Sequence, residues 1–185
     1  MTKARTNADN VTADIAGITA STGLTGGGTS GTVTLAIDTA TTVDLATAQN
    51  LSNKVLIAPE ERTTVSTSAA TATTNFDADT QGVLYLTGST TSDWTLNVRG
   101  SGSTTLNSKL ATGDSISIIF IVTNGGTAYK HSALTIDGNA QTVNWSGGTA
   151  PAAGNASAKD AYSFTIFKTA SATFTVFGAG PVKYA

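Results

Sequence analysis

The chain has no cysteine, a single histidine and few charged residues. Charged side chains make up 12% of its 185 residues, and the formal net charge is -2. Without cysteine there is no disulfide and no thiolate metal site. The small net charge gives no electrostatic reason to bind nucleic acid or an anionic membrane surface. The longest apolar run, residues 116–122, has the length of a strand, well short of the roughly 20 residues of a membrane helix.

Thr, Ser, Ala and Gly take the place of the missing charges, and apolar residues alternate with them. The clearest alternation lies in residues 162–177, where Tyr162, Phe164 and Ile166 share one side of the chain. A period of two is typical of a half-buried strand. A short polar connector joins this run to a second one, which predicts an antiparallel hairpin. Four of the six Phe residues lie here, so we expect the hairpin to supply the densest part of the core.

Residues 63–185 have the pattern of one all-β domain. Turn-rich separators divide them into alternating stretches that we predict to be strands, at 63–68, 82–87, 94–98, 115–122, 129–136, 142–145, 162–168 and 172–177. The dipeptides Asn124-Gly125 and Asp137-Gly138 are typical of hairpin turns. Strands of this number and spacing predict an antiparallel β-sandwich with a jelly-roll-like arrangement.

The preceding residues have a different character. Residues 1–14 show no pattern, whereas residues 32–38 alternate like a strand that follows a glycine-rich turn. A segment of this size cannot bury a core alone, because an isolated hairpin is marginal in water. Its apolar residues must pack on the rest of the chain or on other copies; they are Ile15, Ile18, Leu24, Val33, Leu35, Ile37 and Leu51. We place the boundary between the two regions near residues 60–62.

Two short motifs suggest chemistry that their context does not support. Gly26–Gly28 and Gly31 would suit a phosphate cradle, but a P-loop needs a Gly-Lys-Ser/Thr that leads into a helix. Here a strand follows and no Lys is present, which favours a turn that uses glycine for its positive φ. Glu60 and Glu61 offer paired carboxylates. Adjacent side chains do not converge in a helix or a strand, so a solvated linker is favoured.

His131 is the only histidine. It would form a catalytic triad with Ser132 or Ser163 and with Asp137, but no nucleophile elbow is present. A zinc site needs about three protein ligands from His, Cys or carboxylate, and one His without Cys does not suggest it. We therefore interpret His131 as a strand-edge residue and assign no catalytic residue, no cofactor and no metal.

Six aspartates lie in or beside the predicted turns, where Asp caps backbone groups; they are Asp77, Asp79, Asp93, Asp114, Asp137 and Asp160. Carboxylates in such loops are also calcium ligands, but the spacing of an EF-hand is absent. A polysaccharide depolymerase would use two opposed carboxylates, and scattered turn residues do not suggest such a pair. The capping role is therefore favoured.

Four aromatic residues are candidates for stacking on the sugar rings of a glycan: Trp94, Trp145, Tyr85 and Tyr129. The alternative is packing in the core, because aromatic residues dominate burial in small sandwiches. The core is favoured for the group as a whole. Trp145 is the best candidate for exposure, since the glycines that follow it leave one face open. We keep Trp145, Trp94 and Tyr129 as candidate glycan-facing residues.

Three segments have a distinctive sequence: residues 14–38, which are rich in Gly and Thr, residues 51–59, and residues 141–155 followed by 160–166. The first looks like a segment common in structural fibre proteins of tailed bacteriophages, especially marine and cyanobacterial ones. Residues 51–59, Leu-Ser-Asn-Lys-Val-Leu-Ile-Ala-Pro, are similar to their Leu-Thr-Asn-Lys-Thr-Leu-x-x-Pro element. Residues 141–155, followed by 160–166, resemble their C-terminal head module, in which a fixed order precedes a strand: Trp145, Gly147, Gly148, Pro151, Gly154 and Asn155.

The resemblance implies a non-enzymatic, homotrimeric protein on the virion surface, at the phage head or tail. Residues 1–62 would form a virion-anchoring arm and short intertwined stalk, and residues 63–185 a β-sandwich head. Its partners would be its own copies and other virion proteins of capsid or tail. A tail fibre, a head fibre and a capsid decoration (cement) protein are the alternatives within this class. A host-glycan-binding receptor module is the alternative from another class.

Overall fold

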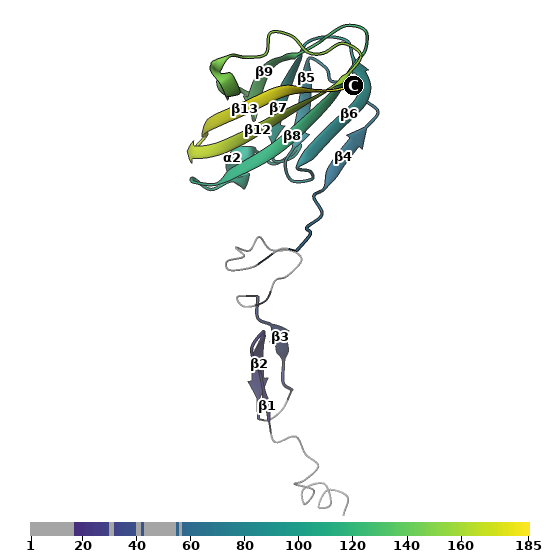
Figure 1. The fold of residues 1–185 in the computed structure, drawn as a ribbon. Helices are drawn as coiled ribbons and strands as arrows, with labels where there is room; N and C mark the ends of the chain where they lie inside the picture. The colour runs from purple at the N-terminus through teal and green to yellow at the C-terminus, as the bar shows by residue number, and fades with distance from the viewer. Residues whose placement is uncertain (1–16, 30–31, 40–41, 43–54, 56) are drawn as a thin grey trace, which may run out of the picture. The chain divides into compact units, whose positions relative to one another are not determined.

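The chain divides into two compact units, Met1–Ile57 and Ala58–Ala185. A computed structural model describes residues 17–29, 32–39, 42, 55 and 57–185 (Figure 1). The boundary expected near residues 60–62 lies just beyond this division. We call the first unit the arm and the second unit the head, and we describe each by itself.

The arm holds a small antiparallel sheet with the order β1-β2-β3, made of β1 (Ile18–Thr19), β2 (Leu24–Gly28) and β3 (Leu35–Ile37). The glycine run lies within β2, so its interpretation as a turn is wrong. Gly26 and Gly27 have φ values of 103° and 122°. A Cβ atom on them would lie 2.2 Å from the carbonyl oxygen of Thr34 and 2.6 Å from that of Ile18. Glycine is required here because the neighbouring backbone lies so close on both sides.

The head is a sandwich of two sheets (Figure 1). The six-stranded sheet has the order β11-β13-β12-β8-β6-β4, made of β4 (Thr63–Ser66), β6 (Val83–Thr90), β8 (Ser115–Asn124), β11 (Val143–Trp145), β12 (Lys159–Ala170) and β13 (Thr173–Tyr184). The four-stranded sheet has the order β10-β9-β7-β5, made of β5 (Thr73–Asp77), β7 (Trp94–Arg99), β9 (His131–Ile136) and β10 (Asn139–Gln141). The predicted all-β sandwich is confirmed.

The pairing of strands is mixed rather than antiparallel. From β4 to β9 the chain crosses to the other sheet after every strand. Neighbouring strands within each sheet therefore run parallel: β4 pairs with β6 and β6 with β8, while β5 pairs with β7 and β7 with β9. Antiparallel pairs join β8, β12 and β13, and also β9 and β10. The expectation of a wholly antiparallel sandwich is therefore wrong, because most separators in the sequence are crossings between sheets.

The two predicted hairpin dipeptides have different outcomes. Asp137 and Gly138 join β9 to β10 with φ values of 52° and 81°, the positive values that a tight hairpin turn requires. Asn124 ends β8, but the next strand, β9, belongs to the other sheet. The prediction is confirmed for Asp137-Gly138 and is wrong for Asn124-Gly125.

The hairpin at residues 162–177 is confirmed as the pair β12–β13. Tyr162, Phe164 and Ile166 are all buried, as the alternation predicts. The four Phe residues, however, are shared between the two faces of the sheet. Phe167 and Phe177 point outward and are 39% and 51% exposed, and their rings contact each other edge to face at 5.9 Å. The hairpin thus supplies only part of its aromatic area to the core.

Trp94 joins the two sheets in the centre of the core. It belongs to β7 of the four-stranded sheet, and its indole packs edge to face on Phe120 and Tyr162 of the six-stranded sheet, with centroids 4.9 and 5.0 Å apart. All three side chains are fully buried. Such pairs add to the free energy of burial when the rings meet edge to face. Leu96, Val98, Leu134 and Ile136 complete the same layer from the four-stranded sheet.

Two short helical turns complete the head. Thr105 caps α2 (Leu106–Lys109), accepting a hydrogen bond from the Ser108 amide, and η1 (Ser146–Gly148) follows β11. Neither of these described helical turns has the length or the apolar character needed to cross a membrane.

Replacement of Trp94 by Ala should lower the free energy of unfolding by about 3–5 kcal/mol, because it leaves a large cavity between the sheets. Urea denaturation followed by circular dichroism measures the change. The exposed Thr73 of β5 provides a control, and Thr73→Ala should change stability by no more than about 0.5 kcal/mol. A loss below about 1 kcal/mol for Trp94→Ala would show that the two sheets do not depend on this contact.

Candidate functional site

The aspartates of the head are occupied by structural contacts. Asp93, Asp114, Asp137 and Asp160 accept hydrogen bonds from backbone amides, which confirms the capping role for these four. Asp77 and Asp79 instead form ion pairs with Arg99 and Lys109 at 2.6 and 2.5 Å. No group of three or more His, Cys, Asp or Glu residues that could hold a metal ion occurs in the described part of the chain.

Gly154 and Asn155, at the end of the segment 141–155, close a loop over the buried carboxylate of Asp160. Asp160 is fully buried and accepts hydrogen bonds from the Asn155 amide at 2.8 Å, from Asn155 Nδ2 at 2.7 Å and from Asn124 Nδ2 at 3.1 Å. Asn124 in turn accepts from the Thr90 hydroxyl. A Cβ atom at Gly154 would lie 2.0 Å from the Tyr129 carbonyl oxygen. Gly154 and Asn155 are thus explained by loop closure and need no ligand.

His131 lies in the core and is not part of a triad. Its ring packs edge to face on Trp94 at 5.2 Å and on Trp145 at 5.2 Å. Burial lowers the pKa of His131 to about 4. Ser163 lies at an outward position of β12, and the Asp137 carboxylate is engaged by the first amides of α2. The structure therefore does not bring the three residues together, and the strand-edge interpretation is wrong because the ring is inside the sandwich.

Two polar atoms in this aromatic cluster, Trp94 Nε1 and His131 Nε2, are buried and have no hydrogen-bond partner among the described residues. Burial also raises the pKa of Tyr162. Unpaired polar groups in a core cost free energy, so the cluster gains its stability from ring packing.

The three candidate glycan-facing residues differ in their exposure to solvent. Trp94 is 0% exposed, so the prediction that it faces a glycan is wrong; the inward position of β7 places it at the sheet interface. Trp145 is half-buried, and its ring packs on Phe164 as well as on His131. Tyr129 is half-buried, and its carbonyl oxygen accepts a hydrogen bond from Asn124 Nδ2 at 3.1 Å.

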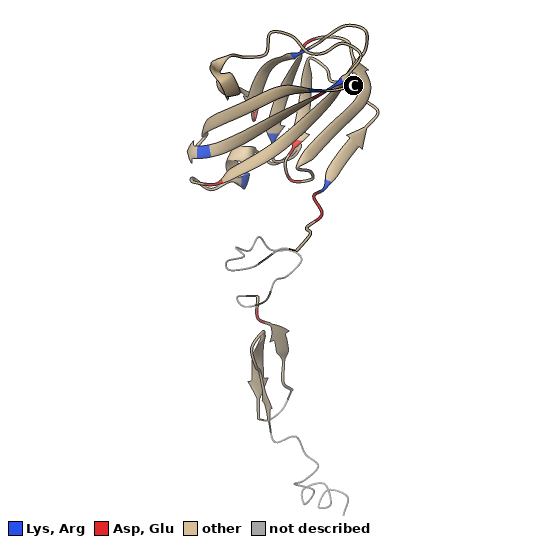
Figure 2. Cartoon of the chain, in the orientation of Figure 1, with Lys and Arg blue, Asp and Glu red and all other residues tan. Residues whose placement is uncertain are grey.

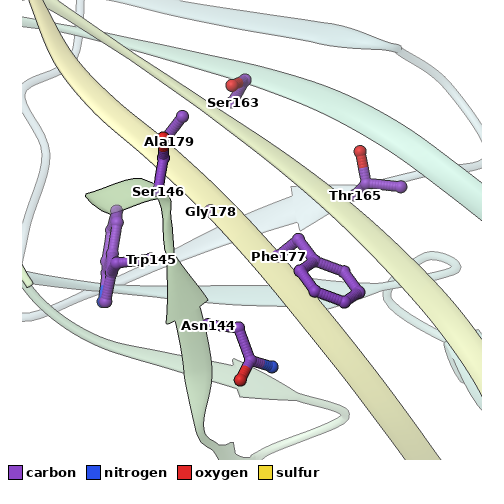
Figure 3. Close-up of a pocket in the computed structure, with 8 residues that line it drawn as sticks. All are labelled: Asn144, Trp145, Ser146, Ser163, Thr165, Phe177, Gly178 and Ala179. Carbon is purple, nitrogen blue, oxygen red and sulfur yellow. The ribbon is translucent and has the colours of Figure 1, made fainter. Parts of the chain in front are cut away.

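A shallow groove of about 350 Å³ lies beside Trp145, where β11, β12 and β13 meet (Figure 3). Its lining is Asn144, Trp145, Ser146, Ser163, Thr165, Phe177, Gly178 and Ala179. In Figure 3 the Phe177 ring and Asn144 lie on one side of β11 and the Trp145 indole on the other. The exposed ring of the groove is therefore Phe177. The sequence analysis did not single it out, although its outward position follows from the alternation with Val176.

The groove is part of a wider apolar surface, which we call the outer face. The outer face consists of the outward positions of the six-stranded sheet. One row of paired residues crosses five strands and contains only apolar and aromatic side chains: Val65, Tyr85, Ile121, Ala161 and Val182. The next row is Thr63, Val83, Ile119, Ser163 and Ala179, and Ser117, Thr165, Phe177 and Asn144 form the third.

Charged residues lie at the margin of the outer face. Lys159 occupies an outward position at one end of β12, opposite Tyr184, whereas Lys168 is buried and donates to two carbonyl oxygens near α2. Figure 2 shows the strands of this sheet in tan, the colour of uncharged residues, along most of their length. Charged residues, in blue and red, lie near the strand ends and in loops. The three rows of the outer face thus contain no charged residue; the first two are largely apolar, and the third is polar apart from Phe177.

The arm presents a second apolar surface. Leu24 pairs with Ile37, and Leu35 pairs with Gly26, so the three large side chains share one face of the small sheet. They are 44–64% exposed. Ile18 and Val33 are half-buried. Ile15 and Leu51, also predicted to anchor the arm, lie outside the described residues.

The chain was compared with known proteins at three levels. No protein-family model, no curated protein and no solved structure matches it.

The stability of the head should fall as the pH is lowered from 7.5 to 5. Because the folded pKa of His131 is about 4 and the unfolded value is about 6.5, the unfolded chain binds a proton in this range that the folded chain does not. The expected loss is about 2 kcal/mol at pH 5. In His131→Phe this loss should disappear, which urea denaturation at each pH will test. An equal pH dependence in wild type and variant would contradict the assignment.

Proposed function

We propose that this chain is a non-enzymatic structural protein of a bacteriophage virion, a short homotrimeric fibre or knob on the particle surface. The observation that carries the proposal is the exposed apolar face of the arm, formed by Leu24, Leu35 and Ile37. A small sheet with one apolar face needs a second layer to cover it. Three copies that intertwine would supply that layer, at about 25 cal/mol for each Å² of apolar surface buried.

The resemblance to phage fibre proteins supplies the location and the partners. The arm segment and the segment around Trp145 are the parts of the chain that resemble these proteins. In this proposal the arm docks on other virion proteins of the capsid or tail, and the head projects. A tail fibre, a head fibre and a capsid decoration protein share this design and differ in copy number and place.

The occupied side chains of the head support a function without catalysis. The carboxylates of the predicted turns are engaged in caps and ion pairs. His131 is buried among aromatic rings. A depolymerase would need two opposed carboxylates with access to a sugar, and the contacts of these aspartates do not favour that use.

Binding of a host glycan is the second candidate function, and the groove of Figure 3 favours it. The Phe177 ring is 51% exposed and offers a face to a sugar ring. Asn144, Ser163 and Thr165 offer amide and hydroxyl groups around it. An aromatic platform with a few convergent polar groups is the usual composition of a small-ligand site.

The arm can be tested with changes on its two faces. The double change Leu35→Ser and Ile37→Ser should weaken trimer formation by at least about tenfold, because it removes apolar area that the copies would bury. Ala36 points to the opposite face of β3, since it pairs with Thr25, and Ala36→Ser is the matched control. Sedimentation velocity across a dilution series gives the mass. A monomeric wild-type chain, or trimers of unchanged strength in the double variant, would refute the role of this face.

The location can be tested on purified particles of the phage that encodes the chain. Immunogold labelling should place it on the virion surface, and quantitative mass spectrometry should give its copy number relative to the major capsid protein. A copy number close to that of the capsid subunits would identify a decoration protein, and a much smaller number at the tail would identify a tail fibre. Absence of the chain from purified particles would refute the proposal.

The second candidate predicts that Phe177→Ala abolishes binding on a glycan array, because the ring is the platform for the sugar. Thr73→Ala, at an exposed position of the other sheet, should leave binding unchanged. If the wild-type chain binds no glycan on an array that covers the surface sugars of the host, the second candidate is wrong.

A further inference from the structure

We propose that the outer face of the six-stranded sheet is the surface through which the heads of neighbouring copies pack against one another. The inference rests on the proposed function, in which copies of the chain associate with one another. It adds the residues through which the heads make contact. It does not depend on the contact that the arm makes.

The two outward surfaces of the sandwich differ sharply in chemistry. On the four-stranded sheet the outward side chains bond to one another: Asn97 Nδ2 donates to Asn75 Oδ1 at 2.8 Å, and the Thr135 hydroxyl donates to Asn97 Oδ1 at 2.8 Å. The ion pair of Asp77 with Arg99 continues this ladder. That surface is polar, charged and suited to water. On the outer face, the row with Phe177 has one such bond, between the hydroxyls of Ser117 and Thr165 at 3.1 Å. The other two rows consist of Val, Ile, Ala and Tyr, with the hydroxyls of Thr63 and Ser163.

Large side chains stay open to solvent on the outer face of a single copy. Val65, Ile119, Phe177, Val182 and Tyr184 are 40–63% exposed. They lie on three strands of one sheet, β4, β8 and β13. Tyr85 of β6 and Ala161 of β12 pair with residues on these strands, so the surface is continuous across the sheet. Contiguous apolar patches of this kind mark places where another molecule binds.

The chemistry of the outer face suits a second copy of the chain. A surface without carboxylates can meet itself without burying like charges, whose desolvation would cost free energy. Strands about 4.8 Å apart and roughly 25 Å long on average present about 700 Å² in a six-stranded sheet, close to the ~800 Å² per partner of a stable interface. Tyr85, Phe177 and Tyr184 supply the aromatic anchors that are enriched in the centres of interfaces. Nucleic acid would require basic residues that the central rows lack.

The first experiment places a charge in the centre of the outer face of the full-length chain. Ile119→Asp should raise the dissociation constant for self-association by at least about 100-fold, because it buries an unpaired charge in the interface. The matched control, Thr73→Asp, places the same charge on the outward surface of β5 and should leave self-association unchanged. Sedimentation velocity gives the mass of each variant, and circular dichroism with a thermal melt shows that each is folded.

The second experiment does not rely on a disruptive change. The chain has no cysteine, so a single cysteine in the full-length chain reports on its own surroundings. Phe177→Cys should react with a maleimide at least about tenfold more slowly in the assembled protein than in protein diluted below its dissociation constant, because a covered thiol is not accessible. Thr73→Cys should react at the same rate in both. Equal rates for Phe177→Cys in the two states would overturn the inference.

The outcomes separate this inference from the proposed function. If Ile119→Asp keeps the wild-type mass while Leu35→Ser with Ile37→Ser dissociates, the copies associate through the arm alone and the inference on the outer face is wrong. If Ile119→Asp dissociates and the arm variant does not, the inference holds and the role of the arm fails. A wild-type chain that is monomeric at every concentration overturns both. Loss of glycan binding in Ile119→Asp without any change of mass assigns the surface to a sugar and overturns the inference.

Discussion

The edge-to-face contact of Trp94 with Phe120 and Tyr162 is the interaction on which the rest of the head depends. It fixes the side of each sheet that faces inward, because strand residues alternate strictly between two faces. Once Tyr162 is inside, Ala161 and Ser163 must be outside, and their partners on β8 follow. On β13 a register shift keeps the two partners, Val182 and Ala179, on the same side although they are three residues apart. The composition of the outer face is therefore set by the same register that builds the core.

The exposed apolar surfaces of this protein indicate more about its role than its Asp and His side chains do. The six aspartates of the head bind backbone amides or form ion pairs, and the only histidine of the sequence packs among aromatic rings in the core. These contacts do not account for the exposed apolar side chains on one face of the arm and on one face of the head. Such area favours association with another molecule.

Much of the fold could be predicted from the sequence, and the failures have physical causes. The period of two located most strands of the head, including β12 and β13. It missed β5, whose single large apolar residue is Phe76, and it could not show that the chain changes sheet after each strand, because turn residues look alike in hairpins and crossings. At the candidate site, the wrong predictions concern which aromatic residues are buried and which are exposed. The aromatic content of the hairpin predicts a core position for Phe177, although the alternation with the buried Val176 turns it outward. Trp94, a candidate for the surface, is central.

The order of the strands along the chain has a consequence for synthesis. β8 lies in the middle of its sheet, and its partner on one side, β12, is synthesised only after β9, β10 and β11. Until then one edge of Ser115–Asn124 is open, and this strand contains an uninterrupted apolar run, residues 118–122. Exposed segments of this kind pair with one another during translation. Productive folding of the nascent head therefore depends on rapid synthesis of the β12–β13 hairpin or on a chaperone that covers the open edge of β8.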